Sequence, residues 1–298
     1  MIERIIKTLK TQDVEIYEYL SLEKLNTMRI KSVARAVIYP LTPTALYNSL
    51  ITLKNSDVKF RVVGGMSNTL FRNDHFDGIL IITSKLNRKS RAENLFFFDC
   101  GVKTGEAIEY ALTNGYGGVE GLRSIPGSIG GALFGNAGAF GSSVSDAFLE
   151  GHFLDLDSGE RITLKKSDMN FSYRHSIMQD KPLLLLSATF KFEECDVNLS
   201  RKKISECSKM RRERQPTNAF SLGSIFKRVE DIGAGYYIEG AGLKGRALGG
   251  AAVSHKHAGF IVNTGGATAS DVIGLIEIIK EAVFNKYGIL LEEEIQII

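Results

Sequence analysis

The sequence predicts a globular protein of mixed α and β structure, and three observations support this. Hydrophobic residues make up 44% of the 298 residues, which is enough to bury a core, while the net charge is only +3. Short runs rich in β-branched and aromatic residues alternate with stretches of helical periodicity. No run of about 18 uninterrupted apolar residues occurs, so we expect a cytoplasmic chain that neither crosses nor binds a membrane.

The first hundred residues alternate between short elements of both types. Ile2, Ile5, Ile6 and Leu9 recur at helical spacing among charged residues, which is unlike the core of a signal peptide. Strands are expected at Ala36–Tyr39, Phe60–Val63, Ile79–Thr83 and Phe96–Asp99, and helices at Pro43–Leu53 and Gly105–Asn114.

The middle of the chain opens with a glycine-rich segment, NGYGGVEGLRSIPGSIGGALFGNAGAFG at 114–141. Glycine lets a backbone turn sharply and approach other atoms closely, so we expect irregular backbone with a specific purpose here. A hairpin of Phe148–Asp157 and Glu160–Leu164 should follow, joined by a turn at Asp157–Gly159. After it comes an apolar strand, Pro182–Phe192.

A polar stretch at Glu193–Asn198 separates two halves, and we predict domains at 1–194 and 195–298. The second half should contain a charged helix at Leu199–Arg214 and a helix from Ser270 to about Lys286, with Ser270 as its N-cap. A final strand is expected at Leu290–Ile298. No repeat of about 20–50 residues occurs, which excludes a solenoid.

Several common sites are not expected. The three cysteines, Cys100, Cys195 and Cys207, are an odd number without metal-ligand spacing, so we expect reduced thiols. His255 and His257 would point to opposite faces of a strand and have no nearby Cys or acidic partner, so no metal is expected. The GxGxxG at 240–245 lacks a preceding strand, a following helix and an acidic residue about 20 positions on, which argues against a Rossmann fold.

Two glycine clusters are candidate phosphate-binding loops. Val62–Thr69 runs from a strand into a tight loop with hydrogen-bonding side chains, and taken alone it fits anion binding and a plain turn about equally well. Ser124–Gly131 and Asn136–Ala139 again combine glycine with hydrogen-bonding residues. Two such loops in one chain suit a long cofactor with a diphosphate.

The basic run Lys209–Arg214 has two interpretations. Such a run most often forms a solvated helix end, but it precedes Gln215–Pro216 and a glycine-serine element, so capture of phosphate from a small ligand is the alternative. The low net charge gives no support to nucleic-acid binding.

Eight motifs in order carry a resemblance to a known family. They are GGMSN at 64–68, EGLRSIPGSIGGALFGNAGAFG at 120–141, FSYRHS at 171–176, RRERQP at 211–216, GSIFK at 223–227, AGLKG at 241–245, VSHKHAGFIVN at 253–263 and LEEEI at 291–295. On these motifs the chain resembles the UDP-N-acetylenolpyruvoylglucosamine reductase (UDP-N-acetylmuramate dehydrogenase) family of peptidoglycan synthesis. The short spacing between Arg174 and Arg211 resembles the compact subtype of that family.

The resemblance implies an α+β fold, a ligand set and a reaction. The fold would be an FAD-binding module of the vanillyl-alcohol-oxidase type in two subdomains, followed by a smaller α+β substrate-binding domain. FAD would be bound non-covalently, NADPH would donate hydride, and the substrate would be a nucleotide sugar. The protein would be a monomer that binds no nucleic acid.

The resemblance also implies site residues. Arg174 and Glu294 would lie at the substrate carboxylate, where Glu294 helps only if it is protonated, and Ser224 would donate a proton to the carbanion. Without the resemblance, each would be interpreted as an ordinary surface or turn residue. The implied cofactor-binding residues are Gly64, Gly65, Met66, Ser67, Asn68, Thr69, Pro126, Gly127, Ser128, Gly130, Gly131, Asn136, Ala137 and Gly138, and the implied substrate-binding residues are Tyr173, Arg211, Arg214, Lys227 and His257.

Two departures from the family pattern leave other functions open. Met66 stands where a glycine is usual, and Gln296 stands where an arginine is usual. The same fold could therefore act on a different unsaturated acid, or hold a flavin without turnover.

Overall fold

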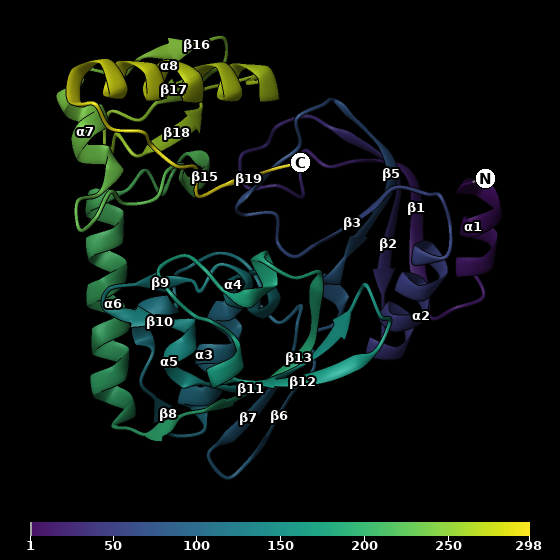
Figure 1. Cartoon of the computed structure of the whole chain (residues 1–298). Coiled ribbons are helices and arrows are strands. Elements are labelled where there is room, and N and C mark those ends of the chain that lie inside the picture. Colours follow the sequence, from purple (N-terminus) through teal and green to yellow (C-terminus); the bar gives the residue numbers. More distant parts are fainter. Residues whose placement is uncertain (1) are drawn as a thin grey trace. The chain divides into compact units, whose positions relative to one another are not determined.

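The computed structural model describes residues 2–298, which form two compact units (Figure 1). Unit 1 comprises residues 2–19, Arg35–Gly65 and Asp77–Ser208, and unit 2 comprises Leu20–Ala34, Met66–Phe76 and Lys209–Ile298. Unit 2 thus includes two segments from the N-terminal part of the chain. The predicted domain boundary between residues 194 and 195 stays a prediction.

The first part of unit 1 is built on a four-stranded sheet in the order β1-β2-β5-β3. Its strands are β1 (Val14–Ser21), β2 (Val33–Pro40), β3 (Phe60–Val63) and β5 (His75–Ile82), with helices α1 (Ile2–Leu9) and α2 (Pro43–Lys54). β3 pairs in parallel with β5, Phe60 opposite Ile79. Leu46, Leu50 and Leu53 are fully buried because they recur at helical spacing on one face of α2.

The second part of unit 1 is a five-stranded antiparallel sheet in the order β12-β11-β13-β7-β6. The strands are β6 (Lys89–Ala92), β7 (Leu95–Asp99), β11 (Phe148–Asp155), β12 (Arg161–Lys165) and β13 (Leu183–Lys191). The predicted hairpin is confirmed. Its turn forms because Asp155 Oδ1 accepts hydrogen bonds from the amides of Asp157 and Ser158, and Gly159 adopts a positive φ of 82°.

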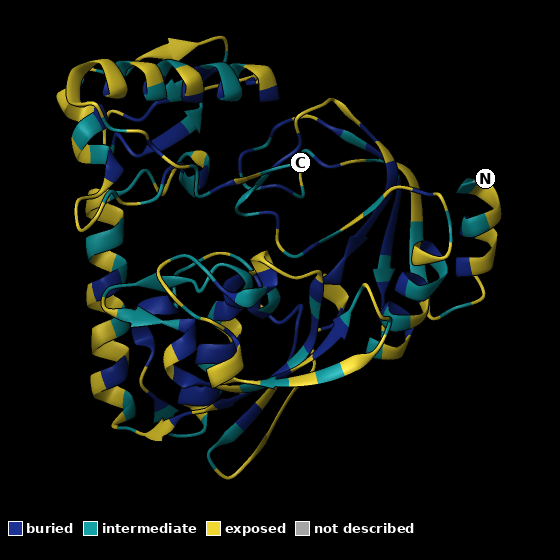
Figure 2. Cartoon of the chain, in the orientation of Figure 1, coloured by how far each residue is buried: buried dark blue, intermediate teal, exposed yellow. Residues whose placement is uncertain are grey.

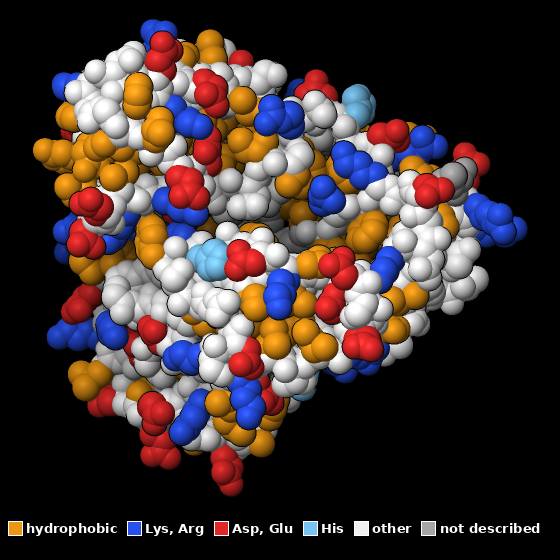
Figure 3. All heavy atoms as spheres, in the orientation of Figure 1, with side chains coloured by type: hydrophobic (Ala, Val, Ile, Leu, Met, Phe, Trp, Pro, Cys, Tyr) orange, Lys and Arg blue, Asp and Glu red, His pale blue; other side chains and the backbone are white. Residues whose placement is uncertain are grey.

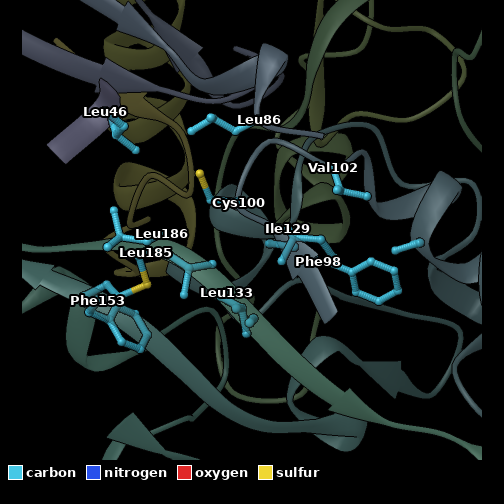
Figure 4. Packing of buried hydrophobic residues seen from close by; sticks show 14 of the residues in the cluster. Leu46, Leu86, Phe98, Cys100, Val102, Ile129, Leu133, Phe153, Leu185 and Leu186 are labelled. Carbon is cyan, nitrogen blue, oxygen red and sulfur yellow. The ribbon is translucent and has the colours of Figure 1, made fainter. Parts of the chain in front are cut away.

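The core of unit 1 encloses Cys100, which Figure 4 shows among Leu86, Val102 and Ile129. Burial raises the pKa of the Cys100 thiol to about 12, so the side chain behaves as a small hydrophobic group. All three cysteines are free, as predicted.

Short elements from the glycine-rich segment and its surroundings complete unit 1. They are α3 (Thr104–Thr113), β8 (Tyr116–Gly117), α4 (Ile129–Phe134), β9 (Gly138–Ala139), β10 (Ser142–Ser143), α5 (Val144–Ala147), β14 (Glu193–Glu194) and the single 3-10 turns Thr83–Lys85, Glu120–Leu122, Lys166–Asp168 and Ile177–Gln179. The charged helix α6 (Val197–Arg214) has mostly exposed or half-buried residues (Figure 2), and Ser200 and Cys207 are its buried positions.

Unit 2 contains a four-stranded antiparallel sheet in the order β15-β18-β17-β16. The strands are β15 (Phe220–Ser224), β16 (Ala247–Leu248), β17 (Ala251–Val253) and β18 (Phe260–Asn263), and the helices are α7 (Ala234–Gly240) and α8 (Ala269–Tyr287). α8 packs on β16 and β17 (Figure 1). Val272, Leu275 and Ile279 of this helix are fully buried in the core of unit 2. The strands β4 (Thr69–Leu70) and β19 (Gln296–Ile297) pair in parallel within the same unit.

Three local predictions were wrong. Thr268 caps α8 instead of Ser270, because Thr268 and Asp271 exchange side-chain and backbone hydrogen bonds in a capping box. The final strand covers only Gln296–Ile297, because the preceding backbone bonds to residues 225 and 227. His255 and Lys256 lie in a bend between β17 and β18, where regular strand pairing stops.

Two exclusions can be compared with the structure. The GxGxxG segment at 240–245 follows α7 and precedes β16, which is the reverse of a Rossmann strand-turn-helix, so that exclusion is confirmed. Across residues 2–298, no helix combines the length and apolar character that a membrane span requires.

Candidate functional site

The two predicted glycine clusters meet within unit 1. A Cβ added at Gly64 would lie 2.4 Å from Ser128 Oγ, and one added at Gly65 would lie 3.3 Å from Gly127 Cα. The first distance is shorter than a real Cβ contact allows, so a side chain at position 64 would displace the Ser128 hydroxyl, and glycine leaves it in place. The loop after β3 and the loop before α4 therefore form one backbone cradle.

Ser128 gives this cradle a hydrogen-bonding group. The residue is 4% exposed, and its Oγ has no hydrogen-bond partner among residues 2–298. A buried hydroxyl left without a partner costs about 1–3 kcal/mol, so such an atom in a native protein calls for an explanation. A ligand oxygen would satisfy it. Gly64, Gly65, Gly127 and Ser128 thus fit the diphosphate of the predicted FAD.

The other predicted cofactor residues of unit 1 make structural contacts in the same segment. The Gly130 amide donates to the Cys100 carbonyl at 2.8 Å, which anchors the start of α4 on the core. The Ala137 amide donates to the Ala132 carbonyl at 2.8 Å. Pro126 and Gly131 are exposed beside the cradle. Asn136 and Gly138 contact the turn that carries Arg174.

Arg174 is held in a strained turn. Ser172 and His175 exchange backbone hydrogen bonds at 3.2 and 3.3 Å, and Arg174 between them has a positive φ of 54°. A non-glycine residue in this conformation costs about 1–3 kcal/mol and persists only where the surrounding structure fixes it. Arg174 Nη2 donates to the Gly138 carbonyl at 3.1 Å. The guanidinium lies over the ring of the exposed Tyr173, 5.3 Å from its centroid.

Two amide side chains fasten this turn to the end of α4. Asn136 Nδ2 donates to the Ser172 carbonyl at 2.9 Å. Gln179 Nε2 donates to the carbonyls of Arg174 at 3.0 Å and Phe134 at 2.9 Å. Sequence reasoning missed Gln179, since no motif or periodicity distinguishes it from other surface residues.

Ser224 and Glu294 come together within unit 2. Ser224 ends β15, where the pairing register shifts between Ser221 and Ser224 and Gly223 takes a positive φ of 82°. Such a bulge redirects the side chain that follows it. The next carbonyl, that of Ile225, accepts a hydrogen bond from the Glu294 amide at 2.7 Å. The backbone of Glu294 is thus held against the residue that follows Ser224.

The predicted loop residues from Met66 to Thr69 also belong to unit 2. Met66 is 4% exposed and has a positive φ of 45°, so a buried side chain occupies a conformation that suits glycine. Ser67 follows it and is half-buried. Asn68 Nδ2 donates to the Glu294 carbonyl at 2.9 Å, and Thr69 pairs with Gln296.

Lys227 and His257 flank the same stretch of backbone. The Lys227 amide donates to the Glu292 carbonyl at 2.9 Å, and its ammonium pairs with the Glu292 carboxylate. The Ile225 amide donates to the Gly259 carbonyl at 2.9 Å, which places the His257–Gly259 bend beside Ser224. Burial lowers the pKa of His257, and its Nδ1 accepts from the Gly259 amide at 3.1 Å, so the neutral ring is favoured.

The basic run Lys209–Arg214 forms the last turn of α6. Arg214 is exposed, whereas Arg211 is half-buried and burial lowers its pKa. Lys256 Nζ donates to the Arg212 carbonyl, which joins this helix end to the bend before β18. On the face drawn in Figure 3, basic and acidic side chains are interspersed.

Comparisons with known proteins cover nearly the whole chain. Residues 34–165 match a family model described as an FAD binding domain, and residues 215–298 match one described as the C-terminal domain of UDP-N-acetylenolpyruvoylglucosamine reductase. The reductase of that name from Caldicellulosiruptor saccharolyticus is 41% identical over 97% of this chain and 94% of its own. That from Latilactobacillus sakei is 35% identical over 100% of this chain and 97% of its own.

Solved structures give the same result. A crystal structure of UDP-N-acetylenolpyruvylglucosamine reductase from Thermus caldophilus matches with a TM-score of 0.80 at 25% identity, covering 95% of this chain and 98% of that one. A berberine-bridge-enzyme-like protein from Physcomitrella patens matches at a TM-score of 0.50 and 19% identity over 64% of this chain and 44% of its own, a likeness of fold alone.

Proposed function

The chain belongs to the family of UDP-N-acetylenolpyruvoylglucosamine reductases, and we propose that Arg174, Ser224 and Glu294 are its catalytic residues. It is an FAD-dependent oxidoreductase of peptidoglycan precursor synthesis with NADPH as hydride donor. The predicted α+β fold class, with an FAD-binding module and a C-terminal substrate module, is confirmed. The reaction reduces the enolpyruvyl ether of UDP-N-acetylglucosamine to UDP-N-acetylmuramate.

The main chemical requirement of this reaction is to stabilise the negative charge that develops on the substrate. FAD that NADPH has reduced would supply hydride for the terminal CH2 of the enolpyruvyl group, and the electron pair of the double bond would then remain as negative charge on the carbon next to the substrate carboxylate. That charge spreads into the carboxylate, so the site needs fixed positive charge there and a proton donor at the carbon.

Arg174 suits the first task. A guanidinium presents a planar fork that can bind both oxygens of a carboxylate at once. Asn136 and Gln179 bond to backbone carbonyls of the Arg174 turn, and the Gly138 carbonyl accepts from the guanidinium, so both the turn and the side chain are held before a ligand arrives. Preorganisation of this kind avoids the cost of ordering the side chain during the reaction.

Ser224 suits the second task, and Glu294 is proposed to lie at the substrate carboxylate with Arg174. A serine hydroxyl is a weak acid in water, but a carbanion is basic enough to take its proton. The observation that supports this proposal is the hydrogen bond from the Glu294 amide to the Ile225 carbonyl, which holds the backbone of Glu294 against the residue that follows Ser224. Lys227, His257, Arg211 and Arg214 are proposed to bind the nucleotide sugar, because all four come from segments bonded to this backbone or to its neighbouring bend.

The cofactor is proposed to lie with its diphosphate at Gly64, Gly65, Gly127 and Ser128 of unit 1. The unpartnered Ser128 hydroxyl and the Cβ clash at Gly64 support this placement. We propose non-covalent attachment, a cytoplasmic location and a monomeric state.

The experiment follows the flavin band under anaerobic conditions. The purified holoenzyme is reduced with NADPH, and UDP-N-acetylenolpyruvoylglucosamine is then added. Rapid return of the band is expected. A band that stays bleached would reject this substrate and favour another unsaturated acid, which is the alternative that Met66 and Gln296 leave open. A panel of enolpyruvyl compounds then tests that alternative. A protein with no bound flavin would contradict the cofactor site.

Ser224→Ala tests the proton donor in the same assay. Reduction of the flavin by NADPH should stay within about threefold of normal, while reoxidation by substrate slows by about 10²–10⁴. Ser221→Ala, in the same strand, is the matched control and should leave both half-reactions unchanged. Equal loss in both half-reactions of Ser224→Ala would show that Ser224 is not the donor.

A further inference from the structure

Asn68 lies in the loop after β3, where the sequence places it among the residues for the flavin. Its contacts point to another partner in unit 2. The side-chain Nδ2 donates to the Glu294 carbonyl at 2.9 Å, and the backbone carbonyl of Asn68 accepts from the Gln296 amide at 2.8 Å. One residue therefore bonds to the main chain at Glu294 and again two positions later.

Glu294 lies where the C-terminal segment passes from one set of backbone bonds to another. Before it, the Glu294 amide bonds to the Ile225 carbonyl, and residue 293 bridges to Phe226. Lys280 on α8 also pairs with the Glu293 carboxylate at 3.0 Å.

After Glu294, the chain pairs with the loop that follows β3. The Ile298 amide donates to the Leu70 carbonyl at 2.9 Å, and the Arg72 amide donates to the Ile298 carbonyl at 2.8 Å. Glu294 is therefore held at its amide by the segment after Ser224, and at its carbonyl by Asn68.

We propose that Asn68 is a positioning residue for Glu294, so that the predicted flavin loop also sets the catalytic carboxyl group. This inference rests on the proposed function, in which Glu294 acts at the substrate. The carbonyl of a residue fixes its ψ angle, and with the amide already bonded this determines where the Cα–Cβ bond points. A donor at that carbonyl thus fixes the point and direction from which the Glu294 side chain leaves the backbone, and an error of about 1 Å at a reacting centre costs up to about 100-fold in rate.

The test compares Asn68→Asp with Asn68→Ala. Asp keeps the shape but, when ionised, has no donor and presents a negative charge to the Glu294 carbonyl, whereas Ala removes the group. Both should slow flavin reoxidation by substrate about tenfold or more in fully loaded enzyme, while reduction by NADPH stays within about threefold. Asn68→Gln, which keeps the amide donor, should recover part of the rate. Asn73→Ala, an exposed asparagine of unit 2, is the matched control.

Two measurements distinguish a positioning role of Asn68 from a role in FAD binding and from a general loss of structure. The dissociation constant of FAD, measured by titrating the apoprotein, should change less than about tenfold in Asn68→Asp. Amide hydrogen exchange across residues 294–298 should be faster in this variant, while exchange in α8 is unchanged.

A double variant gives the decisive result. Because Asn68 is proposed to act through Glu294, adding Asn68→Asp to Glu294→Gln should slow reoxidation by less than about twofold further. If the double variant is slowed by the product of the two single effects, the inference on Asn68 is overturned. The same holds if Asn68→Asp enzyme loaded with flavin is reoxidised at the normal rate while Glu294→Gln is slow. In both cases the proposed function still stands. If Glu294→Gln itself reoxidises normally, the proposed catalytic role of Glu294 fails and the inference falls with it.

Discussion

Glu120 is a buried carboxylate that joins the glycine-rich segment to α6, and its effect on stability can be worked out from its contacts. The residue is 4% exposed. Its Oε1 accepts from the Gly118 amide at 2.9 Å and from Ser200 Oγ at 2.8 Å, and its Oε2 pairs with Lys203 Nζ at 3.1 Å. Burial by itself would raise the pKa of Glu120, but these hydrogen bonds to the charged form outweigh it and lower the pKa from 4.5 to about 2.

The lowered pKa of Glu120 corresponds to a contribution to the free energy of unfolding. One pKa unit corresponds to about 1.4 kcal/mol, so ionised Glu120 contributes about 3 kcal/mol at neutral pH. The figure is an upper value, because Lys203 is half-exposed and its pairing with Glu120 is screened by solvent. Since the pKa is lowered by folding, the contribution is complete above pH 4.5 and is lost as the pH falls toward about 2.

Glu120→Gln removes the charge but keeps a similar shape and one acceptor oxygen. We expect a loss of about 2–3 kcal/mol in the free energy of unfolding at pH 7, measured by urea denaturation followed by circular dichroism. The difference between the two proteins should shrink steadily as the pH falls below 4.5. Glu106→Gln, which removes an exposed carboxylate paired with Lys89, should cost less than about 0.5 kcal/mol.

The pH dependence decides whether the reasoning holds. A loss that is as large at pH 3 as at pH 7 would mean that the substitution disturbs packing and that the charge of Glu120 contributes little. A loss below about 0.5 kcal/mol at pH 7 would refute the assigned hydrogen-bond network.

Two further predictions concern stability. Met66→Gly relieves a left-handed backbone conformation that costs about 1–2 kcal/mol, but it removes a buried side chain that contributes about 1.5–3 kcal/mol. We therefore expect the free energy of unfolding, measured by urea denaturation, to fall by about 1 kcal/mol. A rise would show that backbone strain dominates. Burial lowers the pKa of His257, so below pH 6.5 the unfolded chain binds a proton that the folded protein does not, and stability should fall as the pH drops from 6.5. His257→Gln should flatten this part of the stability curve, and an unchanged slope would contradict a buried neutral imidazole.

The sequence by itself determined the local elements and the chemistry of the loops. The bounds of β3 match the prediction, and α2 and α3 differ from it by a single residue at their ends, because helical and strand periodicity are local properties. Turn chemistry was readable for the same reason, as at Asp155–Gly159. The cap of α8 was misplaced by two residues because Thr268 and Ser270 are both good caps, and only Thr268 makes the reciprocal bonds with Asp271.

Only the tertiary structure decided which distant groups meet. The approach of Gly64 to Ser128, the bond between Ile225 and Glu294, and the bond from Asn68 to Glu294 each join segments far apart in the chain. Periodicity reports which face of an element is buried, but it does not report which backbone donor meets which carbonyl across the fold. Asn68 shows this difference clearly, since a motif marked it as a loop residue for the flavin while its side-chain amide lies on the main chain of Glu294.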